Sequence, residues 1–114
     1  MSRSDAKRLD DIRRICAVVA DIVARGRDLI ETDEIAQLAL ERAVEVAGEA
    51  ASRLGDETRA QYPAAGWREL IAVRVVLAHA YHRVDPDLLW EIASKDFPRL
   101  AHVLGTSTDK SDEP

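Results

Sequence analysis

The sequence predicts an all-α protein, and two observations carry that prediction. Apolar residues recur at steps of three and four in several long segments, which is typical of helices with one buried face. Alanine, leucine, valine, glutamate and arginine dominate the 114 residues, whereas glycine and proline are sparse, at 5 and 4 residues. Four substantial segments of this kind with short connections indicate an antiparallel four-helix-type bundle with a short extra helix.

The first half of the chain contains two of these segments. One helix is expected over residues 5–24. Thr32 or Asp33 can cap a second helix, which is expected to end near Leu54. Small residues widen the apolar stripe of this second helix, and together with Gly48 they allow another helix to approach closely.

The second half begins with an expected helical turn over residues 56–62 and continues with a helix over residues 67–82. Asp85 followed by a proline is typical of an N-cap and a first helical position, so a last helix is expected over residues 86–104. Pro98 should kink or restart this helix, because proline lacks the backbone N–H and its ring clashes with the preceding turn.

Size and composition restrict the class of protein further. Residues 1–104 are expected to form a single domain, and residues 105–114 a polar, disordered tail. The lone Cys16 cannot form an internal disulfide and is expected to pack inertly in the core. Neither a signal peptide nor an apolar run of membrane-spanning length is visible, so a soluble cytoplasmic protein is expected. No ligand set for a metal and no cofactor motif occurs.

The net charge of −5 argues against a general nucleic-acid coat protein, because neutralisation of phosphates drives non-specific binding. It still permits a local site that grips one or two phosphates. Arg74 and His79 are the only ionisable groups in the apolar stretch 70–80, so Arg74 needs a counter-charge, either a protein carboxylate such as Glu49 or Glu45 or an external phosphate.

The spacing of Arg74 and His79 raises a geometric question. Five residues separate the two side chains by about 140° on a straight α-helix. They can converge if the helix is distorted or ends near His79, or if two subunits each supply part of one site across a two-fold axis. We favour the dimer, because an almost entirely apolar helix also needs covering.

The pattern Arg74-x-x-x-x-His79-x-Tyr81 matches the motif of HepT toxins, a family of the HEPN superfamily. Segments on both sides also resemble the family in order: residues 41–51 in the second helix and residues 89–100 in the last one. The resemblance covers about residues 9–104, and the flanking segments make it fairly specific.

The resemblance implies a homodimer with paired motifs near the interface and a metal-independent endoribonuclease activity. His79 would serve as general base or acid on the RNA 2′-hydroxyl and the leaving oxygen. Arg74 would stabilise the charge on the scissile phosphate. In such systems an MntA-type nucleotidyltransferase antitoxin transfers AMP to the motif tyrosine, here Tyr81, which would block and repel RNA.

Three further residues are predicted to support this motif. Glu49 is expected to orient Arg74, and His82 and Arg83 are expected to help bind phosphate. The chain departs from the family at Val75, where members commonly carry Asn. This departure favours an alternative, a catalytically weak helical dimer that binds a nucleotidyltransferase partner or a nucleotide.

Overall fold

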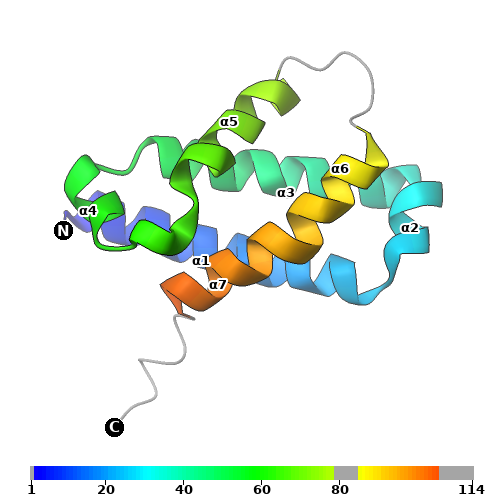
Figure 1. Cartoon of the computed structure of the whole chain (residues 1–114), viewed down its shortest axis with the longest axis horizontal. Coiled ribbons are helices and arrows are strands. Elements are labelled where there is room, and N and C mark those ends of the chain that lie inside the picture. The colour runs from blue at the N-terminus through cyan, green and yellow to red at the C-terminus, as the bar shows by residue number, and fades with distance from the viewer. Residues whose placement is uncertain (1, 79–84, 106–114) are drawn as a thin grey trace, which may run out of the picture.

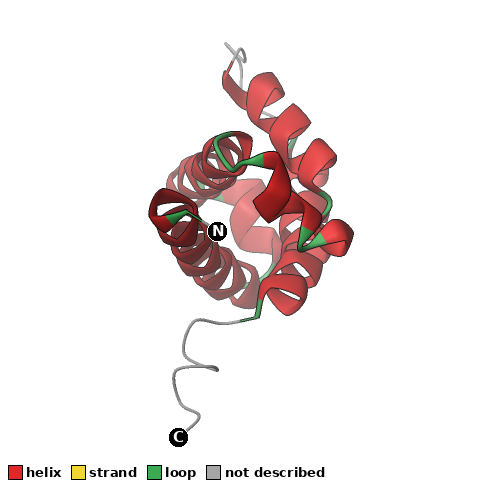
Figure 2. Ribbon diagram, turned by 90° about the vertical axis from the view of Figure 1, so that its left-hand side faces the viewer, coloured by secondary structure: helices red, strands yellow, loops and turns green. Residues whose placement is uncertain are grey.

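The computed structural model describes residues 2–78 and 85–105, and every regular element within these residues is helical (Figure 1). Figure 2 shows the protein turned by 90°, and its described residues form only helices and loops. The elements in chain order are α1 (Arg3–Ala24), α2 (Arg27–Thr32), α3 (Glu34–Ser52), α4 (Asp56–Ala60), the 3-10 helix η1 (Pro63–Ala65), α5 (Trp67–Ala78), α6 (Pro86–Glu91), the π-helical segment η2 (Ile92–Asp96) and α7 (Phe97–Leu104). The all-α prediction is confirmed for the described residues.

Local sequence signals explain where several of these helices begin. The Ser2 hydroxyl accepts a hydrogen bond from the Asp5 N–H at 3.0 Å and caps α1. Of the two caps considered for the second long helix, Asp33 is the one used, because its carboxylate accepts from the Ile35 N–H at 2.9 Å. Asp85 caps α6 as predicted, with Pro86 in the first helical position.

The short helix α2 was not expected from the sequence. Gly26, at φ 100°, turns the chain after α1 and allows α2 to begin at once. Ile30 is fully buried, and the Gln37 side chain donates a hydrogen bond to its backbone carbonyl. A helix of 6 residues is marginal by itself, so these tertiary contacts stabilise it.

The last predicted helix is divided into α6, η2 and α7. The Phe97 N–H donates to the Ile92 carbonyl, one residue further back than in an α-helix, and Pro98 lies in the first turn of α7. The backbone stays helical through Asp96 and Phe97, so the expected kink or restart at Pro98 takes the form of a π-helical turn directly before the proline. The widened turn before it was not foreseen.

The helices pack through the stripes that the sequence predicts. α3 lies between α1 and α5, and α1 also packs against α7. The centre of the α3 stripe is fully buried at Leu40, Val44, Ala47 and Ala51. Burying such side chains stabilises the fold by about 1.5–3 kcal/mol for each large one. No helix in the described part of the chain is both long and apolar enough to cross a membrane.

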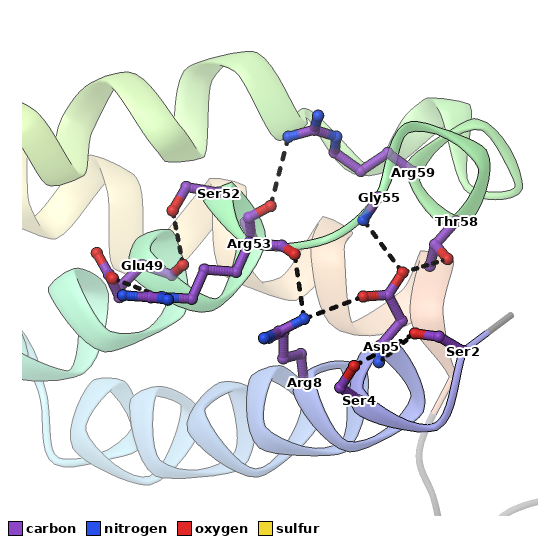
Figure 3. Close-up of polar contacts among 11 residues, drawn as sticks. Ser2, Ser4, Asp5, Arg8, Glu49, Ser52, Arg53, Gly55, Thr58 and Arg59 are labelled. Atoms are coloured by element: carbon purple, nitrogen blue, oxygen red, sulfur yellow. Dashed lines mark hydrogen bonds and ion pairs between the residues drawn. The ribbon is translucent and has the colours of Figure 1, made fainter.

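A buried carboxylate joins the start of α1 to the turn that follows α3 (Figure 3). Asp5 accepts hydrogen bonds from the Thr58 hydroxyl at 2.7 Å and from the Gly55 N–H at 3.1 Å. Arg8 donates both to Asp5 and to the Arg53 carbonyl, at 3.2 Å each. The hydrogen bond from Thr58 is the main cause that lowers the pKa of Asp5, the Gly55 N–H adds to it, and burial opposes both.

We expect Asp5→Asn to lower the melting temperature at pH 7, with a loss that shrinks in acid. Because the folded pKa lies below the ordinary 3.8, the stability from this carboxylate is present above that value and is lost as pH falls through the folded pKa. Thermal melts of both proteins between pH 7 and pH 2.5 measure this. The exposed Asp28→Asn is the control, and an Asp5→Asn deficit that stays constant down to the lowest pH would contradict the assignment.

Candidate active site at the contact of α3 and α5

The start of α5 is held in place by its own first turn. Gly66 adopts a left-handed conformation at φ 77° and ends η1, so the chain turns directly into α5. The Trp67 indole N–H donates to the Arg59 carbonyl at 3.1 Å, which ties this turn to α4. Leu70, one turn later, is buried in the core. Trp67 is therefore an anchor for the start of α5, and it fixes the direction in which Arg74 follows.

Arg74 lies on the side of α5 that faces α3. Its stem packs against Gly48, where α3 and α5 make the close approach that the small residues predict. Its Nη1 atom lies 3.0 Å from Glu49 Oε1, with 29% of the Arg74 side chain and 42% of the Glu49 side chain exposed. Of the two carboxylates considered as counter-charges, Glu49 pairs with Arg74. Glu45 instead pairs with Arg42 at 3.2 Å.

Glu49 is shared between two cations. The Arg53 Nε–H donates to its other carboxylate oxygen, Oε2, at 2.8 Å (Figure 3). This hydrogen bond is the main cause that lowers the pKa of Glu49; partial burial opposes it, and the positive charge of Arg74 lowers the pKa further. Glu49 is therefore ionised at neutral pH and supplies the counter-charge that Arg74 needs. Arg53 is not among the residues predicted for the site, although its position four residues after Glu49 is the ordinary signal for such a pair.

Two buried polar atoms have no hydrogen-bond partner in the described part of the chain: Arg74 Nε, at this contact, and Glu41 Oε2, elsewhere on α3. An unpaired buried donor costs about 1–3 kcal/mol, so it is tolerated only where other contacts hold the side chain. In Arg74 those contacts are the packed stem and the ion pair to Glu49. The guanidinium keeps its remaining terminal donors, which can bind a phosphate oxygen.

The outer side of α5 is more exposed than the sequence suggests for a helix that is apolar nearly all round. Val75 and Val76 are 44% and 55% exposed. Within one chain α5 is thus covered on the α3 side and open on another. The core of the described chain therefore leaves these two valines partly uncovered.

The other predicted site residues lie outside the described residues. These are His79, Tyr81, His82 and Arg83. Their positions relative to Arg74, and the question whether Arg74 meets His79 within one chain or across a dimer, stay predictions. The described α5 extends to Ala78, directly before the motif histidine.

Other candidate chemistry in the described residues is weaker. Cys16 is buried, and burial raises the pKa of its thiol to about 11, so it remains protonated and packs in the core as expected. No group of three His, Cys, Asp or Glu side chains among residues 2–78 and 85–105 could hold a metal ion. A cavity of about 210 Å³ on another side of α5 is lined mainly by apolar side chains and does not include Arg74.

Comparison with known proteins identifies the family. Residues 8–106 match the family described as ribonuclease HepT-like, so the chain belongs to that family. A relative from Thermococcus cleftensis, named as a probable ribonuclease HepT, is 31% identical over 102 residues, which cover 88% of this chain and 92% of the relative. A protein of Methanocaldococcus jannaschii with the name of a putative RNase is 29% identical over an alignment of 99 positions, which covers 77% of this chain and 91% of that protein. No solved structure gives a significant match.

Proposed function

We propose that this protein is the toxin of a HepT/MntA-type toxin–antitoxin pair: a metal-independent endoribonuclease that AMP transfer to Tyr81 silences. Membership of the ribonuclease HepT-like family supports a nuclease. The structural observation that carries the proposal is Arg74, whose guanidinium is held by Glu49 while part of the side chain stays open to solvent. A cation fixed before the substrate arrives stabilises developing negative charge without reorganisation.

The reaction needs a base, an acid and a charge stabiliser. His79 removes the proton from the RNA 2′-hydroxyl, or returns one to the leaving oxygen. The 2′-oxygen attacks phosphorus, the bond from phosphorus to the 5′-oxygen breaks, and a cyclic phosphate and a 5′-hydroxyl result. Arg74 donates hydrogen bonds to the phosphate oxygens while charge builds on them. Arg83 follows the motif and adds positive charge for the RNA backbone, and His82 can donate a hydrogen bond to a phosphate oxygen.

The proposal includes a homodimer in which two motifs lie near one interface. The exposed Val75 and Val76 support it, because apolar side chains on α5 gain stability when a second subunit covers them. A two-fold axis there also brings Arg74 of one subunit toward His79 of the other. Sedimentation of the purified protein measures its mass, and a monomer at the concentrations used for cleavage assays would remove this part of the proposal.

We expect the unmodified protein to cleave single-stranded RNA in the presence of EDTA and to leave cyclic phosphate ends. His79→Ala should reduce the rate by about 10²–10⁴-fold, the usual contribution of a general base or acid. His102→Ala is the matched control, because His102 is exposed on α7 and should keep the full rate. Cleavage that His79→Ala leaves unchanged would remove the mechanism, and cleavage that EDTA abolishes would show that a metal is needed.

Val75 favours a second candidate, a catalytically weak helical dimer that binds a nucleotidyltransferase partner or a nucleotide. The residue is 44% exposed next to Arg74, where an amide side chain could contact substrate. In the main proposal the native chain already cleaves RNA, and Val75→Asn changes the rate little. In the second, Val75→Asn restores cleavage that the native chain lacks, and a gel assay of both proteins distinguishes them.

We expect the intact mass of this protein to rise when it is co-expressed with a nucleotidyltransferase antitoxin encoded by a neighbouring gene. The rise should be a whole number of AMP groups, each less one water. The Tyr81 oxygen attacks the α-phosphorus of ATP and pyrophosphate leaves, so the side chain gains bulk and negative charge where an RNA phosphate should lie. Tyr81→Phe should abolish the mass increase. Tyr62 is the other tyrosine of the sequence, so Tyr62→Phe is the matched control and should retain the mass increase. A modification mapped to a residue other than Tyr81 would contradict the proposal.

A further inference from the structure

Gly48 lies at a close contact between α3 and α5. A Cβ atom built on it would lie 2.6 Å from Arg74 Cβ and 2.9 Å from the Leu70 carbonyl oxygen. Carbon atoms in ordinary contact are about 3.5–4.0 Å apart. Both atoms belong to the backbone of α5 or are bonded directly to it, so no side-chain rotation can relieve the overlap. Any residue other than glycine at position 48 therefore forces α5 away from α3.

The conformation of Gly48 gives no other reason for a glycine. It lies inside α3, and the glycines with positive φ among the described residues are Gly26, Gly66 and Gly105. Glycine is less favourable than alanine in the interior of a helix, because it loses more conformational freedom on folding. The space left for Arg74 and Leu70 is what accounts for Gly48.

This close contact decides where the Arg74 side chain starts. Its Cβ lies against the α3 backbone, and the side chain then reaches Glu49, the residue after Gly48, at 3.0 Å. Nε, nearer the backbone than the nitrogen that pairs with Glu49, is buried without a hydrogen-bond partner in the described chain. The stem is thus held by packing, and the ion pair acts only at the far end of the side chain.

We infer that Gly48 is a positioning residue for Arg74: the absence of its side chain sets the place of the guanidinium, and Glu49 then holds it. The inference rests on the proposed function in so far as Arg74 acts on RNA. The separation of α3 from α5 then sets the position of the Arg74 guanidinium, and with it the rate of the chemical step. A displacement of about 1 Å in a catalytic group can reduce the rate about 10²-fold.

Gly48→Ala tests this with two readouts. We expect kcat for RNA cleavage to fall about 10²-fold with KM nearly unchanged, because the charge that Arg74 stabilises develops in the transition state. In the same protein labelled with ¹⁵N-arginine, the Arg74 Nε–H signal, assigned by its loss in Arg74→Lys, should change its shift and exchange faster with water than in the native chain. A Gly48→Ala protein with native kcat and a native Nε–H signal overturns the inference.

Val44→Ala is the matched control for a loss of stability alone. Val44 is fully buried on the same helix, so the variant should melt at a lower temperature. It leaves a cavity and does not push α5 outward, so kcat and the Arg74 signal should stay native. If Val44→Ala changes both as much as Gly48→Ala does, general destabilisation explains the effect and the inference is wrong.

Glu49→Gln covers the case in which Gly48→Ala does not fold. This variant keeps the close contact of Gly48 with Arg74 and removes the negative charge of residue 49. The Arg74 Nε–H should therefore exchange with water as slowly as in the native chain. Loss of that protection in Glu49→Gln would mean that the ion pair, and not the packing at Gly48, positions the stem. The NMR readout needs no catalysis, so a native chain that fails to cleave RNA would refute the proposed function while leaving the role of Gly48 to be judged from the signal.

Discussion

The contact of α3 with α5 at Gly48 and Glu49 is the constraint on which the candidate site depends. It combines two requirements in adjacent residues. Gly48 allows the helices to touch without a side chain between them, and Glu49 supplies a negative charge where the Arg74 side chain ends. Without the close approach Arg74 would start from a different place, and without the carboxylate a half-buried guanidinium would lack a counter-charge.

The rest of the fold holds this contact in position. The buried stripe of α3 fixes the helix against α1, and the Asp5 cluster ties the start of α1 to the turn that follows α3. That turn leads through α4 and η1 into Trp67, which anchors the start of α5. Each link is made by buried or hydrogen-bonded groups, so α5 is restrained at its start as well as along its α3 side.

Two guanidinium groups share one carboxylate at this site, so the positive charges outnumber the negative one. Glu49 is shared by Arg53 and Arg74, so the carboxylate does not neutralise Arg74 alone. An approaching phosphate can therefore add to the set of charges around Arg74 through donors that the carboxylate leaves free. A net charge of −5 is compatible with membership of a ribonuclease family, because a site that grips one or two phosphates requires a local cation and not a basic surface.

Sequence alone determined the features that depend on neighbouring residues along the chain. The all-α class, the apolar stripes of α1 and α3, the Asp85 cap and the presence of an irregularity at Pro98 follow from periodicity and from the chemistry of single residues, and the motif pointed to the family. Tertiary structure decided the features that need distant partners. A six-residue α2 forms because Gln37 and the core hold Ile30, and Asp5 finds Thr58, 53 positions away. Likewise, the spacing of Glu45 and Glu49 allowed either to face Arg74, and only the register in which α5 packs on Gly48 selects Glu49, because that register is set by the contact between two helices and is not encoded in either one.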